Sequence, residues 1–162
     1  MTSALFEFPI PALTPDRAMA IDQDSQALKQ AFQDLQSLGL WQLRVPRRWG
    51  GLELALKSFY QTQVNLSRAS GALAFLQTQH QSACALLSQI ASVDQQAKIF
   101  PAIAAGQLSV GIGVSHLRHR PPSVQAIPWD GGYRLTGKIP WITGHGVFDQ
   151  YLGGAILPNQ DT

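Results

Sequence analysis

The chain has 162 residues, of which 45% are hydrophobic and 14% charged, and its formal net charge at pH 7 is +2. This length suits one ordinary domain, or one domain with part of another. The nearly neutral charge argues against a broad nucleic-acid-binding surface. The single cysteine, Cys84, excludes an internal disulfide and is typical of a reducing compartment.

No stretch of the sequence approaches the roughly 20 consecutive apolar residues that span a bilayer. The start of the chain, Met1 to Pro9, lacks both the basic residues and the long apolar run of a secretory signal. We therefore expect no membrane span and a cytoplasmic protein.

The chain from Thr14 to about Gln107 has a helical pattern. Thr14 is placed to cap a first helix, Pro15 suits its first position, and Gly39 offers a stop. Between them, apolar residues recur at helical spacing. These residues are Ala18, Ile21, Leu28, Ala31, Phe32, Leu35 and Leu38.

Three further helices are expected, at about 56–67, at about 72–90, and from Ser92 or Asp94 onward. The helix at 72–90 is apolar over much of its surface, so we expect it at the centre of a helical bundle. In the last helix, Pro101 is expected to kink the helix or to begin a new one.

Beyond residue 107, glycine, proline and alternating apolar residues predict strands. Leu108 to Ser115 alternates, and Asp130-Gly131-Gly132 is a hairpin turn signal between 123–127 and 133–136. Two more short strands are expected, at 141–143 and 151–157. A sheet region of only about 50 residues can hardly form a complete hydrophobic core by itself.

The sequence therefore predicts an α+β protein. Its first domain, 1–107, is a helical bundle, and its second, 108–162, is an incomplete antiparallel β domain.

Three segments, in this order along the chain, carry a resemblance to a known family. They are Leu38-Gly39-Leu40 with Val45-Pro46 and Gly50-Gly51, then Ile99 to Gly106, then Gly132-Tyr133-Arg134-Leu135-Thr136-Gly137-Lys138-Ile139-Pro140-Trp141-Ile142-Thr143. They resemble passages of acyl-CoA dehydrogenases, the last of them the pattern Tyr-x-Leu-x-Gly-x-Lys-x-Trp-Ile-Thr. Lys138 lies one position nearer the glycine than in that pattern.

The resemblance runs from roughly Leu38 to Leu157. It covers the helical amino-terminal domain of the family and part of its middle β domain, without the carboxy-terminal helical domain.

The resemblance implies FAD as cofactor and Trp141, Ile142 and Thr143 as residues that contact it. Trp141 offers a flat apolar surface beside the isoalloxazine ring, and Thr143 offers hydrogen-bond donors. In a second flavin-contacting loop of the family, Ser115 takes the place of a threonine, while the Glu-Pro and Gly-Ser-Asp elements of that loop are absent here. The alternative is a strand whose aromatic side chain packs against the sheet.

The loop around Ser115 is basic because it contains Arg118 and Arg120. Such a loop suits a pyrophosphate or a CoA phosphate, and alternatively it is a solvated basic loop. We expect no metal site from His116 and His119, because no acidic or cysteine ligand accompanies them.

Three other residues carry side chains that are often reactive in proteins. His80, on an apolar helix, is expected to be a hydrogen-bonded core histidine, and Cys84 a small buried residue. His145 fits either the flavin edge or a plain turn.

Arginines at 44, 47 and 48 alternate with Trp41 and Trp49, a pattern that nucleic-acid contacts also use. One such cluster in a nearly neutral chain favours a surface or interface loop instead.

Acyl-CoA dehydrogenation removes a proton α to a thioester while hydride leaves the β carbon for the flavin, and the proton step requires a base. In most of the family this glutamate lies in the carboxy-terminal domain. No Asp or Glu of this sequence falls in a family catalytic motif, so no catalytic residue is predicted.

The resemblance thus implies an FAD-dependent acyl-CoA dehydrogenase-like flavoprotein that is incomplete as this chain alone. An acyl-CoA or similar small molecule is its expected substrate. A homo-oligomer, or a partner that supplies the missing helical domain, is also expected. Two alternatives remain open: a flavin-dependent monooxygenase of the same fold, and a non-enzymatic interaction remnant.

Overall fold

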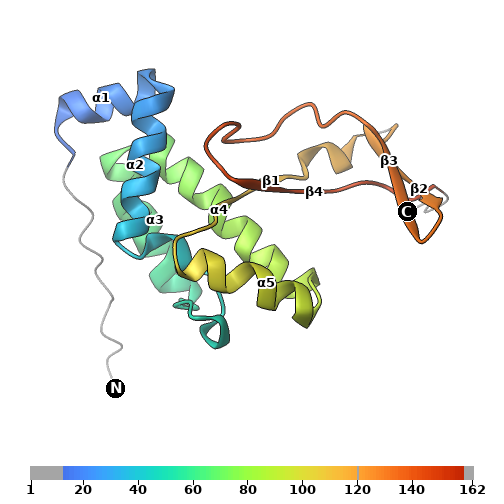
Figure 1. Cartoon of the computed structure of the whole chain (residues 1–162). Coiled ribbons are helices and arrows are strands. Elements are labelled where there is room, and N and C mark those ends of the chain that lie inside the picture. Colours follow the sequence, from blue (N-terminus) through green and yellow to red (C-terminus); the bar gives the residue numbers. More distant parts are fainter. Residues whose placement is uncertain (1–12, 120, 159–162) are drawn as a thin grey trace. The chain divides into compact units, whose positions relative to one another are not determined.

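The computed structural model describes residues 13–119 and 121–158, and Figure 1 shows the order of their helices and strands. The chain divides into two compact units between Ser109 and Val110. The first unit is helical, and the second holds the strands found among the described residues. The expected α+β class, with helices first and a small sheet second, is confirmed.

The helical unit is built around α4. Its α-helices are α1 (Pro15–Gln23), α2 (Ser25–Ser37), α3 (Leu56–Ala69), α4 (Gly71–Ile90) and α5 (Val93–Ala104), with short 3-10 turns η1 (Leu40–Gln42) and η2 (Arg47–Trp49). Helix α4 has buried residues along most of its length and contacts α1, α2, α3 and α5. The central place predicted for it is confirmed, and the reason is its apolar surface.

The first helical segment differs from the prediction, because it is two helices rather than one. The Thr14 hydroxyl accepts from the backbone N–H of Arg17 at 3.3 Å, as expected of a cap. The chain then breaks at Asp24, whose backbone is extended and whose carboxylate accepts from the N–H of Gln26 at 2.9 Å. Asp24 therefore caps α2, and an unbroken apolar periodicity does not reveal such a cap.

Interactions between residues close in sequence explain where helix α5 begins and how it continues through Pro101. Ser92 and Gln95 form a reciprocal capping box, with Gln95 N donating to Ser92 Oγ at 3.3 Å and Ser92 N to Gln95 Oε1 at 2.9 Å. The helix runs through Pro101 without restarting. Proline cannot donate to the carbonyl of Ala97, but Ala97 is exposed, where solvent can replace the missing donor.

Buried polar side chains of α4 hold the segment between α2 and α3. Gln81 donates to the carbonyls of Leu40 at 3.0 Å and Trp41 at 2.9 Å, and accepts from the N–H of Arg44 at 2.8 Å. His80 Nε2 lies 3.0 Å from the Trp41 carbonyl. The prediction that His80 is a hydrogen-bonded core residue is thus confirmed.

The described residues of the sheet unit form two pairs of strands and one 3-10 turn. Its elements are β1 (Val110–Gly113), η3 (Ser115–Arg118), β2 (Val124–Trp129), β3 (Gly132–Gly137) and β4 (Gln150–Gly153). The hairpin β2–β3 is antiparallel, from the pair Val124 and Gly137 to the pair Trp129 and Gly132. A parallel bridge between Gln125 and Ile156 connects the segment after β4 to the hairpin.

The antiparallel expectation holds for this hairpin but not for β1 and β4, which pair in parallel with Gly113 opposite Gly153. A parallel pair requires a long crossover connection, and the chain between β1 and β4, which includes the hairpin, provides it. The strand expected at 141–143 is wrong, because this segment is irregular and leads into a turn. Pro140 lacks an N–H for pairing, and Gly144 turns the chain with φ of 72°.

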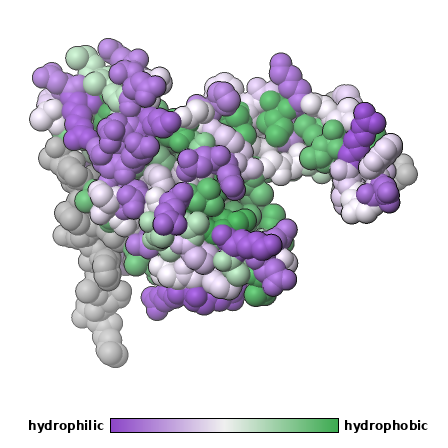
Figure 2. Space-filling view, viewed as in Figure 1, coloured by the Kyte–Doolittle hydropathy of each residue, from purple (hydrophilic) through white to green (hydrophobic). Residues whose placement is uncertain are grey.

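The hairpin exposes large apolar side chains. Ile127, Trp129, Tyr133 and Leu135 are between 42% and 66% exposed. In Figure 2, hydrophobic residues, in green, appear on the surface of this unit, on the right of the view. Apart from the Arg134 guanidinium, 5.7 Å from the centroid of the Trp129 ring, the described part of the sheet unit leaves much of these side chains uncovered, which agrees with an incomplete β domain.

Across the residues that the structure describes, we find no helix with the length and apolar content needed to cross a bilayer.

Candidate functional site

The segment from Trp141 to Thr143 lies beside the end of β1. A Cβ atom added to Gly113, the last residue of β1, would stand 2.9 Å from Cδ1 of Ile142. The Ile142 side chain therefore lies directly on the Gly113 backbone, an approach that only glycine permits. Ser115 follows two residues after Gly113, so the structure brings the two predicted flavin-contacting segments to one end of the strand pair.

An aromatic pair fixes the following turn onto the strands. The Tyr151 hydroxyl donates to the carbonyl of Gly144 at 2.6 Å, and its ring meets that of Phe148 edge to face at 6.0 Å. Phe148 is buried and presses on β1, since a Cβ at Gly111 would lie 2.5 Å from its ring. The position of 141–143 is thus set by packing on both sides of the turn.

Trp141 is 69% exposed, and Ile142 and Thr143 are half-buried. The indole Nε1–H of Trp141 donates to the hydroxyl oxygen of Thr143 at 3.3 Å. This bond uses the oxygen of Thr143 as acceptor and leaves its O–H able to donate. The segment therefore presents a flat apolar ring with a hydroxyl donor beside it.

Ser115 is exposed at the start of η3, and two neighbours anchor this turn to the chain after β4. His116 is 1% exposed, with Nε2 lying 2.9 Å from the carbonyl oxygen of Gly154. Leu117 lies on the same residue, since a Cβ at Gly154 would be 2.7 Å from Cδ1 of Leu117. The sequence places His116 in a basic loop and does not predict this anchoring role, although Leu117 beside it indicates local burial.

The basic character of the loop lies at its surface. Arg118 and His119 are exposed, and Arg120 lies outside the described residues. His145 is exposed on the turn that follows Thr143. In the ranges 13–119 and 121–158, no three His, Cys, Asp or Glu side chains are grouped so as to hold a metal ion.

Cys84 has no part in a site. Its side chain is fully buried on α4, and burial raises the pKa of the thiol to about 12. A protonated, inaccessible thiol is unreactive, so the prediction of a small buried residue is confirmed.

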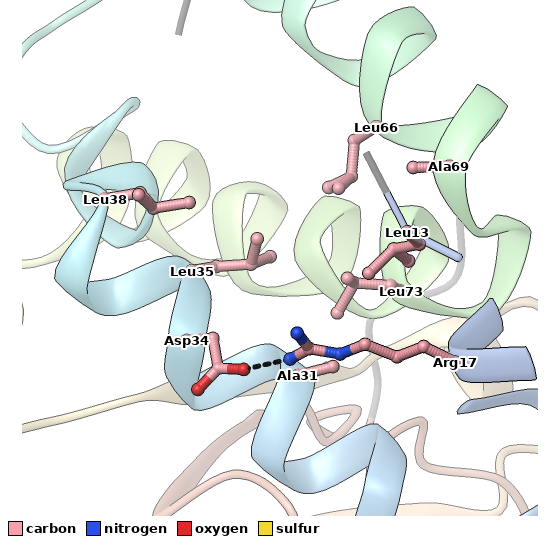
Figure 3. A pocket seen from close by; sticks show the side chains of 9 residues that line it. All are labelled: Leu13, Arg17, Ala31, Asp34, Leu35, Leu38, Leu66, Ala69 and Leu73. Carbon is pink, nitrogen blue, oxygen red and sulfur yellow. Dashed lines mark hydrogen bonds and ion pairs between the residues drawn. The ribbon is translucent and has the colours of Figure 1, made fainter. Parts of the chain in front are cut away.

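A hollow lies in the helical unit, and Figure 3 shows its lining. It is lined by Leu13, Arg17, Ala31, Asp34, Leu35, Leu38, Leu66, Ala69 and Leu73. Its polar groups are paired, because Arg17 donates to Asp34, which also accepts from Gln30 at 3.0 Å. Since its lining offers only aliphatic side chains and this ion pair, we place the candidate functional site in the sheet unit.

The residues of that site fit a flavin in their chemistry. A flavin ring requires an apolar surface, which the exposed face of Trp141 provides, and donors at its polar edge. The hydroxyls of Thr143 and Ser115 are such donors, on segments that packing holds in place.

Several solved structures share this fold. One is TdsC of Paenibacillus sp. A11-2, a dibenzothiophene monooxygenase solved with FMN and indole, at 22% identity and TM-score 0.74 over 89% of this chain and 36% of that one. Another is an acyl-CoA dehydrogenase of Bacillus anthracis complexed with FAD, at 21% identity and TM-score 0.75 over 93% of this chain and 27% of that one. A third is the FAD complex of PigA, at 20% identity and TM-score 0.69 over 90% of this chain and 45% of that one.

At these identities the likeness establishes the fold alone. The chain spans less than half the length of each of these relatives. No curated protein sequence matches the chain.

The helical unit carries the sequence evidence for a family. The family profile described as "Acyl-CoA dehydrogenase, N-terminal domain" matches residues 12–107, more than half of the chain. This range ends just before β1 and includes the helices α1 to α5. By this match, together with the shared fold, the chain belongs to the acyl-CoA dehydrogenase family and contains its N-terminal domain.

Proposed function

We propose that this chain is part of an FAD-dependent oxidoreductase and that its sheet unit supplies one side of the flavin site. The observation that carries the proposal is the exposed indole of Trp141, fixed beside the end of β1 by the contact of Ile142 with Gly113. Solved relatives of the fold are described as complexes with FAD or FMN, which supports a flavin as the ligand. A bound flavin supplies hydride-transfer chemistry that side chains lack.

Each residue of the site has a proposed part in binding. The Trp141 ring packs beside the isoalloxazine, with Ile142 holding the segment against β1. The hydroxyls of Thr143 and Ser115 donate to polar atoms of the flavin. The exposed guanidinium of Arg118 lies on the same turn as Ser115 and suits a phosphate group.

The proposed reaction is the α,β-dehydrogenation of an acyl-CoA thioester, with FAD as hydride acceptor. This follows the family to which the chain belongs. The described residues include no carboxylate that we assign as the base, so we propose that the base comes from elsewhere. A further helical domain, a partner chain or a second copy of this chain would supply it, since the solved relatives are much longer than this chain.

A pair of tryptophan variants tests the flavin site. We expect the chain to bind FAD and Trp141→Ala to raise the dissociation constant about tenfold, which corresponds to about 1.4 kcal/mol of lost ring contact. Trp141→Phe keeps an aromatic face and should bind within about threefold of the wild type. Quenching of flavin fluorescence on titration with protein measures all three affinities.

Trp129 provides the matched control, because its side chain is 64% exposed on the hairpin, compared with 69% for Trp141. Trp129→Ala should leave the affinity for FAD unchanged. An equal loss in both alanine variants would place the flavin elsewhere. A wild-type chain that ignores FAD would support the interaction remnant instead.

A flavin-dependent monooxygenase is the second candidate. Relatives of the fold include the dibenzothiophene monooxygenase TdsC and a 3-HSA hydroxylase of Rhodococcus sp. RHA1. The turn after β1 also lacks the Glu-Pro and Gly-Ser-Asp elements of acyl-CoA dehydrogenases.

One comparison on the flavin-loaded protein separates the two reactions. Anaerobic bleaching of the flavin absorbance on addition of an acyl-CoA supports dehydrogenation. Oxygen consumption with reduced flavin and an aromatic acceptor such as indole, without bleaching by acyl-CoA, would contradict dehydrogenation and support the monooxygenase.

A further inference from the structure

His116 is the buried titratable group nearest in sequence to the candidate flavin site, and its hydrogen bond defines its tautomer. The ring is 1% exposed, and Nε2 lies 2.9 Å from the carbonyl oxygen of Gly154. A carbonyl oxygen only accepts, so Nε2 carries the proton and donates it. Nδ1 is buried and has no hydrogen-bond partner among the described residues, so the ring is held through Nε2 alone.

The carbonyl that His116 contacts lies next to the parallel pair of strands β1 and β4. Gly154 directly follows β4, whose last residue, Gly153, pairs with Gly113 at the end of β1. Leu117 packs on the same Gly154. The hydrogen bond therefore connects η3 to the parallel strand pair from which η3 departs.

The four residues of η3 divide into anchors and exposed groups. His116 and Leu117 face the unit and are buried or half-buried, whereas Ser115 and Arg118 on either side of them are exposed. Because a turn of four residues has little rigidity of its own, its position depends on what its anchors hold. The positions of Ser115 and Arg118 therefore depend on the bond from His116 together with the packing of Leu117 on Gly154.

We infer that His116 is a positioning residue, whose Nε2–H bond to Gly154 fixes Ser115 and Arg118 relative to the segment from Trp141 to Thr143. The inference adds a residue to the proposed flavin site and rests on that proposal for its functional consequence. An apolar side chain of similar size would fill the space of the ring but would remove the donor.

Two amide variants test the donor rather than the volume. In His116→Gln the side-chain amide nitrogen reaches about as far as Nε2, whereas in His116→Asn it stands nearer the place of Nδ1. His116→Leu removes hydrogen bonding altogether. The control is Val124→Ala, which removes buried volume from the hairpin at a position outside η3.

Amide hydrogen exchange of residues 115–119 in the purified chain is the first measurement, and it requires no flavin. We expect exchange to rise about tenfold in His116→Asn and His116→Leu and to stay close to wild type in His116→Gln and Val124→Ala, which corresponds to about 1.4 kcal/mol for the lost bond. The amides of the hairpin, recorded in the same experiment, show whether each variant is folded.

The dissociation constant for FAD is the second measurement. The variants without the donor should bind FAD about tenfold more weakly, while His116→Gln should bind within about threefold of wild type.

The outcomes separate this inference from the flavin proposal. Unchanged exchange at 115–119 in His116→Asn and His116→Leu overturns the inference, whatever the affinity for FAD. Equal exchange in His116→Gln and His116→Asn also overturns the inference, because side-chain volume would then be responsible. An equal rise of exchange in Val124→Ala overturns it too, because general stability would then be responsible. If exchange rises in His116→Asn and His116→Leu while their affinity for FAD does not change, His116 holds η3 but has no effect on flavin binding. A wild-type chain that binds no FAD overturns the flavin proposal, and the exchange data alone then decide whether His116 holds η3.

Discussion

Gln96 is a buried residue of α5 whose side chain forms hydrogen bonds with neighbouring segments. Its side-chain nitrogen donates to the carbonyls of Ser88 at 3.2 Å and Ala91 at 2.9 Å. Its oxygen accepts from Arg48 at 2.7 Å and from the indole of Trp49 at 3.3 Å. Arg48 and Trp49, which resemble a nucleic-acid-binding pattern in sequence, are therefore tied to α5.

Trp41, the other tryptophan of that pattern, is 7% exposed. Its ring stacks on Phe32 at 4.9 Å, and its Nε1 donates to the Phe32 carbonyl at 2.9 Å. Because this ring is buried, it has no face for a base, and the structure favours the surface loop over nucleic-acid contact.

At the residue scale, we predict that Gln81→Leu strongly destabilises the helical unit. Gln81 is 1% exposed and bonds to the backbone of Leu40, Trp41 and Arg44. Loss of these bonds leaves a buried N–H unpaired and should lower the free energy of unfolding by about 2 kcal/mol. Urea unfolding followed by circular dichroism measures this. Gln89→Leu, the same substitution at an exposed position of α4, should change stability little, and equal losses would contradict the prediction.

Cys84 predicts a pH dependence of stability. Burial raises the pKa of its thiol from 9.0 to about 12, so between these values the unfolded chain loses the proton and the folded chain keeps it. The unfolded state then binds fewer protons, and stability falls as pH rises. The Cys84→Ala variant lacks this contribution of the thiol to the pH dependence of stability.

Between pH 8 and pH 10, the wild type should therefore lose about 1 kcal/mol more stability than Cys84→Ala. Urea unfolding of both proteins across this range checks the difference, in which the titration of the other groups cancels. Parallel curves for the two proteins would show that the thiol ionises equally in the folded state.

At the element scale, caps decide where the helices begin, and they act through one or two hydrogen bonds. Thr14, Asp24, Ser70 and Ser92 each accept from a backbone N–H in the first turn of α1, α2, α4 and α5 respectively. Two of these, Thr14 and Ser92, were recognisable because they precede a helical pattern. Asp24 was not, because the apolar periodicity continues on both sides of it.

Asp24→Ala should destabilise the helical unit by about 1 kcal/mol, since the N–H of Gln26 loses its partner. Asp22→Ala is the matched control, at an exposed position within α1 and two residues away. Thermal or urea unfolding of both variants measures the difference. Similar stabilities of the two variants would mean that α2 does not depend on this cap.

At the scale of the whole molecule, the two units differ in how complete their cores are. The helical unit buries Phe32, Leu40, Phe100 and Ile103 to 1% exposure or less. The sheet unit, in contrast, exposes Trp129 and other large apolar side chains of the hairpin. We propose that the helical unit is a domain in its own right.

A fragment of residues 1–109 should therefore keep its helical circular dichroism and unfold cooperatively in urea. A fragment of residues 110–162 should show no cooperative transition, because so few strands cannot close a core alone. A molten 1–109 fragment would show that the helical unit requires the rest of the chain.

The sequence by itself determined the family, the helical pattern, the central place of α4, the hairpin turn and the candidate segment from Trp141 to Thr143. These features depend on residues that are neighbours in sequence, so local composition and spacing carry them. Only the tertiary structure decided that β1 pairs with β4 in parallel, that Ile142 lies on Gly113, and that His116 bonds to Gly154. These contacts join residues about 30 to 40 positions apart, and their geometry depends on the packing of the whole unit, which no local pattern encodes.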